Sequence, residues 1–438
     1  MTYKISMIGA GSSVFTPQVI SMCIKSKALR GSTISLMDVN EQRLEVMATL
    51  AKKLVEKTGS ELKIESTSDR VQCLTGTDFV ITTIAVGGNK AWENDLEIPG
   101  KYGICGPYND SIGPGGIMRA FRHVPIMVQM CKELEAVAPN AWVLNYTNPA
   151  TALCWVMLRQ SKIKVASLCT NTTPLRDPKF ISSWVGVKPD DVVVPPPAAG
   201  INHCAGLLEI HLKDGRDAFQ LIRQRIRHPV VRWALDTYGI LPYAWPHWME
   251  FYPSLCKLQA EYKGRIQGMP LGYGISVEDI KNDLARVRQW EDLVAKWVRG
   301  EGEVSLEAIP KTQPIQVVEV IEALIEDRKE VHVVNVLNHG AIDNLPSDAV
   351  VEVSALVSGQ GIQPLHVGPL PKAIAAFLRV HLAVEELSFE AGLTGDRRLA
   401  LQAFELDPFV SARLTPPETS RLLDEMLVAH AAYLPQFQ

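Results

Sequence analysis

YKISMIGAGSS, residues 3–13, decides the fold that this sequence predicts. Residues 3–8 (YKISMI) are a strand candidate, and the spacing of apolar residues over 16–26 indicates a helix. Gly9 permits a tight turn between the two, and Gly11 carries no side chain that would block a pyrophosphate from the helix N-terminus. Strand, glycine turn and helix in this order predict the first unit of a dinucleotide-binding sheet.

Two further strands follow at the spacing that such a sheet requires. Residues 33–37 read TISLM and end at Asp38, an acidic residue placed to bind ribose hydroxyls. An acidic side chain here favours NAD over NADP, whose 2′-phosphate it would repel. A helix over 41–58 and a third strand over 79–85 complete the pattern. We therefore predict an α/β fold with a Rossmann-like, doubly wound parallel sheet.

The chain length predicts a second lobe, because 438 residues exceed the size at which one core usually stops growing. A fifth strand over 163–168 would place residues 1–200 in the NAD-binding domain. Residues 201–438 are expected to form an α+β, mostly helical domain for substrate, metal and oligomerisation, with an overall fold like lactate or malate dehydrogenase. Within it we expect a hairpin that turns at 214–215 and a continuous helix over 218–238.

Composition and charge exclude several classes of function. A formal charge of −4 provides no basic field for nucleic acid or an anionic membrane. No apolar run is long enough to span a membrane, and we expect no signal peptide. None of the eight cysteines falls in a CxxC motif, which argues for reduced thiols and a cytoplasmic location. We expect a small-molecule substrate and a homodimer or homotetramer.

Cys169 and His203 are candidate metal ligands. Cys169 follows the strand expected over 163–168, where open α/β sheets collect their ligands, and His203 follows a second apolar stretch. A thiolate and an imidazole could hold a divalent transition metal and leave coordination positions for a substrate. Both residue types are also common in protein cores, so the pair alone leaves a metal site and an inert core open.

Three polar residues on either side of the fourth expected strand, residues 141–145, are candidates to reach a substrate. Asp110 and Arg119 lie at the entry to a helix, and a surface ion pair or a helix-dipole partner is the alternative for each. Asn148 lies in NYTNP, at the end of a strand, where a dehydrogenase fold places an amide near the nicotinamide and the substrate. A simple Asn-Pro turn is its alternative.

The sequence resembles glycoside hydrolase family 4, the NAD- and metal-dependent glycosidases, from about residue 3 to 430. The matching motifs occur in order: IGAGSSVFT, LMDV with Asp38, AVGG, SIGPGGIMRAFR, NYTNP, the Cys169 turn, GINH ending at His203, and VVNVLNHGAIDNLPSDAVVEV. GPGGIMRA, NYTNP and HWMEFYP are most similar to the branch of α-galactosidases and α-galacturonidases.

The resemblance implies cofactors and their ligands residue by residue. Cys169 and His203 would be the protein ligands of a divalent metal, usually Mn²⁺. Asn148 would contact substrate hydroxyls, with Arg119, Asn171 and His203 beside the substrate. The residues that would line NAD are Gly9, Gly11, Ser12, Ser13, Asp38, Asn40, Val86, Gly87 and Asn148.

The chemistry implied by the resemblance is a redox-assisted hydrolysis, an exception to the usual two-carboxylate mechanism. NAD would take hydride from C3 of the sugar, which acidifies the C2 proton. A base removes that proton, the C1 leaving group is eliminated, and water adds back at C1. C2 is then reprotonated and NADH returns the hydride to C3, so the hydrolysis has no net redox change. His247 is our first candidate for the base, Tyr243 the second, and Asp110 the candidate general acid. For His247 the alternative is a histidine stacked among core aromatic residues.

Two departures from the family pattern leave the sugar open. Residues 170–172 (TNT) follow the cysteine where family members carry other residues, and residues 241–253 keep the family's frame but lack the carboxylates that precede it in α-galactosidases. In addition, residues 311–313 (KTQ) leave room for an anionic sugar. Three aromatic residues near the candidate base are expected to form either a sugar-stacking wall or part of the core. They are Trp245, Trp248 and Phe251.

Three classes of function are compatible with these patterns. The first is a glycosidase for an unphosphorylated hexoside of the α-galactoside or uronide type, or an NAD-dependent sulfoquinovosidase with the same chemistry. The second is an NAD-dependent hydroxy-acid or sugar dehydrogenase, since the first lobe would support either activity. The third is an NAD-binding sensor that binds no manganese. Stoichiometry separates the first two, because only the dehydrogenase accumulates NADH.

Overall fold

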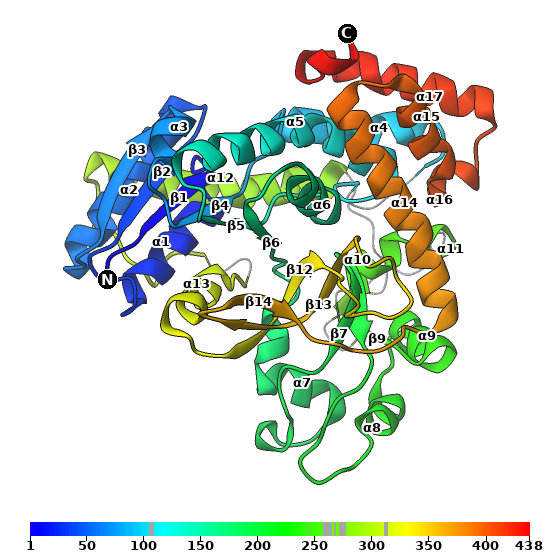
Figure 1. Ribbon diagram of the computed structural model, residues 1–438. Coiled ribbons are helices and arrows are strands. Elements are labelled where there is room, and N and C mark those ends of the chain that lie inside the picture. Colours follow the sequence, from blue (N-terminus) through cyan, green and yellow to red (C-terminus); the bar gives the residue numbers. More distant parts are fainter. Residues whose placement is uncertain (105–108, 244, 257–264, 267–268, 271–276, 311–313) are drawn as a thin grey trace.

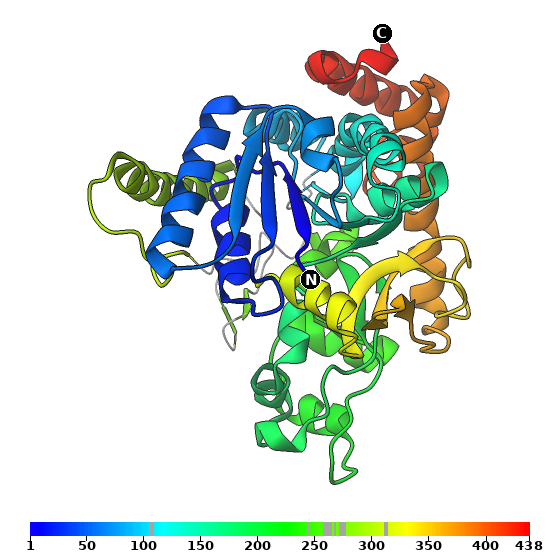
Figure 2. The ribbon, with the colours of Figure 1, turned by 60° about the vertical axis from the view of Figure 1, so that its left-hand side comes forward.

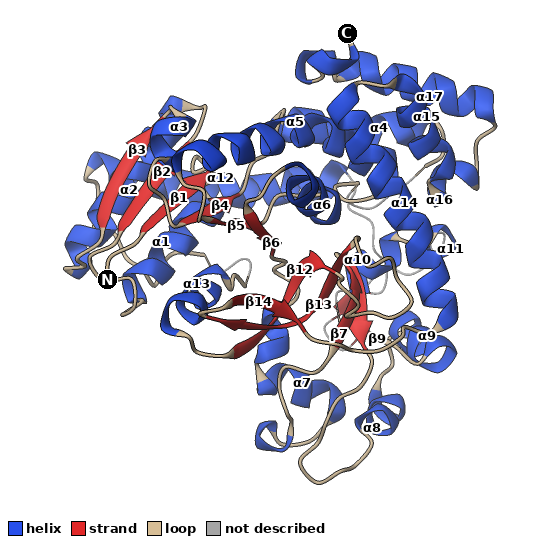
Figure 3. Ribbon diagram, viewed as in Figure 1, coloured by secondary structure: helices blue, strands red, loops and turns tan. Residues whose placement is uncertain are grey.

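The computed structural model describes residues 1–438 except 105–108, 244, 257–264, 267–268, 271–276 and 311–313. Helices lie on both sides of one long sheet (Figure 3). The N-terminus lies beside the parallel strands, and the C-terminus lies among the outer helices (Figure 1).

The first six strands are parallel and confirm the predicted Rossmann-like fold. Their order is β3-β2-β1-β4-β5-β6, which reverses direction at β1 and so places a ligand crevice outside the carboxyl ends of β1 and β4. β3 escaped prediction because it is an exposed edge strand of mostly polar residues. The strands are β1 (Lys4–Ile8), β2 (Thr33–Met37), β3 (Lys63–Thr67), β4 (Phe79–Thr82), β5 (Trp142–Asn145) and β6 (Lys164–Ser167).

Six helices connect these strands and cover both faces of the sheet. α2 matches the helix predicted over 41–58, because apolar side chains recur on its buried face and Asn40 caps its N-terminus. α5 is long and buried over most of its length, and it packs on α4, α6 and α3. The helices are α1 (Phe15–Lys25), α2 (Glu41–Thr58), α3 (Arg70–Leu74), α4 (Gly88–Lys101), α5 (Gly113–Val137) and α6 (Ala150–Gln160).

The sheet continues past β6 with strands that come later in the chain, giving 12 strands in all. These strands pair antiparallel in the order β6-β12-β13-β7-β8-β9, and β14 pairs with β13. The expected domain boundary at residue 200 falls within β7 and stays a prediction. The added strands are β7 (Ala198–Ile201), β8 (Cys204–Leu207), β9 (Leu241–Pro242), β12 (Glu330–Leu337), β13 (Val350–Ser358) and β14 (Gly361–Pro364).

The remaining described elements are mostly helical. The short strands β10 (Arg265–Ile266) and β11 (Met269–Pro270) pair with each other. Four 3₁₀ turns are η1 (Thr173–Arg176), η2 (Pro189–Asp191), η4 (Ala431–Tyr433) and η5 (Pro435–Phe437). The α-helices are α7 (Pro178–Val185), α8 (Ala218–Arg225), α9 (Pro229–Tyr238), α10 (Trp245–Glu250), α11 (Pro253–Cys256), α12 (Val277–Arg299), α13 (Val317–Glu326), α14 (Lys372–Thr394), α15 (Arg397–Leu406), α16 (Pro408–Ser411) and α17 (Pro416–Ala429).

Two predictions for the second lobe were wrong. The helix expected over 218–238 is split into α8 and α9, because Pro229 begins a new helix with His228 as its N-cap. The hairpin expected at 214–215 does not form, since Leu212 instead makes an isolated bridge with Val192. α12 lies beside α2 on the outer side of the parallel sheet (Figure 2).

One large apolar core extends from the parallel sheet to the C-terminal helices, and a second, smaller core lies under α7 and α8. None of the helices that the structure describes is long and apolar enough to cross a membrane.

Candidate active site

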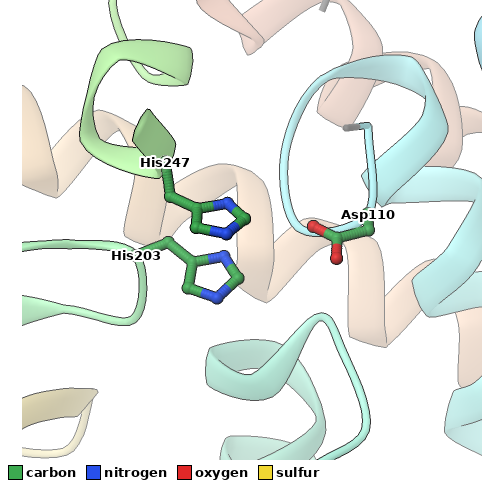
Figure 4. Close-up of side chains that lie close together, drawn as sticks. All are labelled: Asp110, His203 and His247. Carbon is green, nitrogen blue, oxygen red and sulfur yellow. The ribbon is translucent and has the colours of Figure 1, made fainter. Parts of the chain in front are cut away.

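Asp110, His203 and His247 come together from three separate parts of the chain (Figure 4). Asp110 precedes α5, His203 lies in the loop between β7 and β8, and His247 lies in α10. One carboxylate oxygen and one nitrogen of each ring all lie within 4.8 Å of one another. Among the described residues, no other group of three or more His, Cys, Asp or Glu side chains is placed in this way.

The loop of His203 is a tight connection between two paired strands. Ile201 pairs with Cys204, so Asn202 and His203 alone form the loop. His203 has a φ of +67°, a left-handed conformation that is uncommon for a residue other than glycine. The pairing of β7 with β8 thus holds the backbone of His203 in a conformation that the local sequence does not favour.

Ser111 connects Asp110 to His203. Its hydroxyl donates to Asp110 Oδ1 at 2.9 Å and lies 3.1 Å from His203 Nδ1. Because the single hydroxyl hydrogen goes to the carboxylate, Nδ1 of His203 carries a hydrogen that it donates to the serine oxygen. The lone pair of His203 is then on Nε2. Sequence reasoning missed Ser111, which carries no signal beyond its place next to Asp110.

Asn148 and Arg119 lie on the other side of Asp110. Asn148 Nδ2 donates to Asp110 Oδ2 at 2.9 Å, and Arg119 Nε donates to the Asn148 carbonyl oxygen at 3.0 Å. Three of the predicted substrate-facing residues therefore form one hydrogen-bonded group with the carboxylate at its centre.

His247 is oriented by a buried carboxylate. Its Nδ1 lies 2.7 Å from Oε1 of Glu250, whose side chain is 2% exposed. A carboxylate accepts hydrogen bonds, so this contact selects the tautomer with hydrogen on Nδ1 and the lone pair on Nε2. His247 and Glu250 are three residues apart on α10, and this helical spacing is the signal that could have singled out Glu250.

Burial determines the protonation of the two imidazoles. It lowers the pKa of His203 to about 3, with a further contribution from His247, and it lowers the pKa of His247 to about 4. Both rings are thus neutral at neutral pH, with lone pairs available to a metal ion or a proton.

Asp110 behaves differently from a carboxyl group in an apolar pocket. Burial alone would raise its pKa, but the basic side chains around it and the Asn148 amide stabilise the charged form, so the pKa lies below its usual value. At neutral pH Asp110 is therefore a carboxylate that accepts hydrogen bonds.

Cys169 lies where predicted, directly after β6, but outside the group of Asp110, His203 and His247. Burial, with the nearby charge of Glu352, raises the pKa of its thiol to about 12. Asn171 Nδ2 donates to Cys169 Sγ at 3.6 Å, and Thr172 Oγ1 donates to the Cys169 carbonyl oxygen at 2.8 Å. The TNT segment thus builds the turn that holds the sulfur.

Tyr243 is engaged by a buried acidic residue that sequence reasoning missed. Its hydroxyl donates to Glu352 Oε1 at 2.6 Å, and burial together with the Glu352 charge raises the pKa of the phenol well above its usual value. A phenolate is therefore disfavoured, which makes His247 the better base of the two. Glu352 is the single charged residue of β13, VVEVSALVS, and that isolation in an apolar strand is its sequence signal.

The aromatic residues beside His247 belong to the core as far as they are described. Trp248 and Phe251 are 0% and 1% exposed, so they cannot offer a face to a sugar without rearrangement. The side chain of Trp245 lies outside the described residues, as do residues 311–313, for which we expected room for an anionic sugar.

The glycine turn after β1 is shaped for a close approach of backbone. Gly9 has a φ of +93°, and a Cβ there would lie 2.7 Å from the Thr83 carbonyl oxygen. A Cβ on Gly11 would lie 2.8 Å from Asp38 Oδ2, the atom that accepts a hydrogen bond from Gly11 N at 2.8 Å. Gly9, Gly11 and Asp38 thus meet at the carboxyl ends of β1 and β2.

The other residues predicted to line NAD have protein partners here. Ser12 Oγ accepts from Phe15 N, Ser13 Oγ donates to Glu291 Oε1, and Asn40 Oδ1 accepts from Arg43 N. Val86 N donates to His123 Nε2, and Gly87, with a φ of +80°, is the N-cap of α4. Their contacts to a cofactor stay predictions.

Comparisons with known proteins match nearly the whole chain. The model of "Family 4 glycosyl hydrolase" matches residues 4–177, and that of its C-terminal domain matches residues 198–410. An alpha-galactosidase of Bacillus subtilis (strain 168) is 32% identical over 449 residues, covering 99% of this chain and 100% of that protein. A probable 6-phospho-beta-glucosidase of the same organism is 30% identical over 459 residues, covering 99% and 98%.

A solved structure shares the fold over the whole chain. It is a 6-phospho-alpha-glucosidase from gut microorganisms in complex with NAD and Mn²⁺, with a TM-score of 0.82, 20% identity and full coverage of both chains. At this level of identity the likeness concerns the fold alone.

Proposed function

This chain belongs to family 4 of the glycosyl hydrolases, and from that membership we propose that it cleaves an unphosphorylated hexoside of the α-galactoside or uronide type with NAD and a divalent metal such as Mn²⁺. The group of Asp110, His203 and His247 carries the proposal. The alpha-galactosidase similarity over the full chain supports the choice of sugar.

The residues present fit both cofactors. The turn at Gly9 and Gly11 has no room for side chains, as a pyrophosphate-binding turn requires, and Asp38 lies beside it as a ribose acceptor. Neutral imidazoles, a carboxylate and a thiol are donors that suit Mn²⁺ or Zn²⁺. When bound, NAD supplies a hydride acceptor and the metal supplies a Lewis acid.

We assign His203 to the metal, since it belongs both to the predicted pair with Cys169 and to the group with Asp110 and His247. Cys169 is the second proposed ligand. Its high thiol pKa means that metal binding has to displace a proton, so affinity should rise with pH.

The remaining residues handle protons and orient the substrate. His247, neutral and oriented by Glu250, is placed to accept a proton through Nε2. Asp110 begins as an acceptor, so its predicted role as general acid requires that it first take up a proton. Asn148 and Arg119 orient Asp110 and present polar groups to sugar hydroxyls.

A panel of nitrophenyl glycosides tests the function. With NAD, Mn²⁺ and a reducing agent, we expect release of nitrophenol from the α-galactoside or α-galacturonide, no net NADH, and solvent deuterium at C2 of the product. Cleavage of a 6-phospho-β-glucoside or a sulfoquinovoside alone would replace the proposed sugar and keep the chemistry. Stoichiometric NADH without nitrophenol would identify a dehydrogenase instead.

We also propose a cytoplasmic homodimer or homotetramer. Six of the cysteines are free and buried, which suits a reducing compartment. Light scattering on the purified protein measures the assembly, and a monomer at micromolar concentration would contradict it.

A further inference from the structure

Glu352 is a completely buried carboxylate that accepts three hydrogen bonds. Its Oε1 accepts from the Tyr243 hydroxyl at 2.6 Å. Its Oε2 accepts from Asn202 Nδ2 at 3.0 Å and from Asn335 Nδ2 at 2.9 Å. The side chain is 0% exposed, so these contacts replace water on both oxygens.

The sheet register places Glu352 in the middle of a row that crosses four strands. Ser167 of β6 pairs with Asn335 of β12, Asn335 pairs with Glu352 of β13, and Glu352 pairs with Gly200 of β7. Paired residues hold fixed positions relative to one another, so this row ties the end of β6 to the end of β7.

The two proposed metal ligands lie just beyond the two strands at the ends of that row. Cys169 comes just after β6, and His203 comes just after β7. Glu352 also binds the side chain of Asn202, the residue before His203 in the two-residue loop. It therefore lies between the two ligands and restrains the loop of one of them.

All three donors to Glu352 are neutral. Among the described residues, no lysine or arginine forms an ion pair with it. A buried charge compensated only by dipoles is costly. Its field favours a cation at the adjoining position.

We infer that Glu352 is a positioning residue for a divalent cation. Its three hydrogen bonds and its buried negative charge hold Cys169, which follows β6, and His203, which follows β7, in place to bind that cation. This inference rests on the proposed metal-dependent function. In this role Glu352 of β13 supports cation binding without itself contacting the ion.

Glu352→Gln separates the charge from the hydrogen bonds. The glutamine oxygen can accept from both asparagine amides, and its NH₂ group can donate to the Tyr243 oxygen, so the fold is retained. Asp407→Asn is the matched control, because Asp407 is also 0% exposed but caps α16, where asparagine is an equally good cap.

Calorimetric titration of the apo protein with MnCl₂, without substrate, is the readout. We expect Glu352→Gln to weaken Mn²⁺ binding about 10- to 100-fold, with NAD affinity and melting temperature unchanged, and Asp407→Asn to bind Mn²⁺ as the wild type does. Glu352→Leu, which also removes the hydrogen bonds, should lose Mn²⁺ binding and melt at lower temperature.

The outcomes distinguish this inference from the function beneath it. Wild-type Mn²⁺ affinity in Glu352→Gln would overturn the role of the charge and leave the proposed function intact. Equal losses of Mn²⁺ and NAD binding in that variant would also overturn the role of the charge, because they would show a general structural role for Glu352. A wild-type protein that binds no Mn²⁺ would instead refute the proposed metal-dependent function.

Discussion

The imidazole rings of His203 and His247 are stacked, with their centroids 3.9 Å apart and their planes 18° from parallel. Burial lowers the pKa of both rings, to about 3 and about 4, so two neutral rings can stack without charge repulsion. The contact joins the proposed metal ligand and the proposed base in one unit, and a change in either should affect the other.

Substitution of the two histidines should separate their roles. His203→Gln is expected to abolish Mn²⁺ binding and activity, because it removes a ligand. His247→Gln is expected to keep Mn²⁺ binding and lose about 10²- to 10⁴-fold in kcat, the range for a general base. Titration with MnCl₂ and rate measurements on the same preparations give both values. Loss of Mn²⁺ in His247→Gln would make His247 a ligand in its own right.

Cys169→Ser should lose Mn²⁺ affinity, since a serine hydroxyl does not ionise at neutral pH and so cannot supply the anionic ligand that a thiolate provides. Asn171→Ala should weaken Mn²⁺ binding less, because it removes only the amide that donates to Sγ at 3.6 Å. Cys23→Ala is the control, a cysteine 1% exposed in α1 and without a proposed role. Unchanged Mn²⁺ binding in Cys169→Ser would restrict the metal to the Asp110, His203 and His247 group.

Gly11→Ala should disrupt the cofactor turn. The added Cβ would lie 2.8 Å from Asp38 Oδ2 and 3.0 Å from Arg43 Cβ, so the ribose-binding carboxylate has to move. We expect NAD affinity, measured by calorimetry, to fall at least tenfold. Gly100→Ala, a helical glycine with nothing within 4 Å of its Cβ, should leave NAD affinity unchanged and stabilise α4 slightly. Equal NAD affinity in both variants would place the cofactor elsewhere.

Asp95→Ala should be strongly destabilising. Asp95 forms two hydrogen bonds with Arg122, at 2.9 Å and 2.6 Å, and the two side chains are 0% and 1% exposed. Removing one partner leaves a buried unpaired charge, which costs about 3–5 kcal/mol. Urea denaturation measures the loss. Asp214→Ala, which breaks the exposed pair with Arg216, should leave the urea midpoint unchanged. Similar midpoints for the two variants would show that the Asp95 pair is not needed for stability.

Glu385→Gln should change how stability depends on pH. Burial raises the pKa of Glu385 from 4.5 to about 8, so between these values the unfolded chain loses a proton that the folded protein keeps. The unfolded state then binds fewer protons, and wild-type stability falls as pH rises through this window. Glutamine removes the effect, so the variant should gain stability relative to wild type from about pH 5 to about pH 8. Parallel pH profiles in thermal denaturation would contradict the shift.

Local signals in the sequence were sufficient for part of the fold. The apolar runs of β1 and β2, the periodic apolar face of α2 and the glycine turn between β1 and α1 are encoded within short stretches, so each was predicted. The same kind of reasoning failed at β3, whose exposed edge position leaves it polar, and at Pro229, which interrupts an otherwise continuous helical pattern.

The sequence by itself determined the Rossmann-like lobe, the acidic residue beside the glycine turn, and Asp110, His203 and His247 as separate candidates. Only the tertiary structure decided that these three share one space, that Tyr243 donates to Glu352, and that Glu352 lies between the ends of β6 and β7. The physical reason is that these contacts depend on pairing between strands far apart in the chain. Such pairing leaves no periodic pattern in the local sequence.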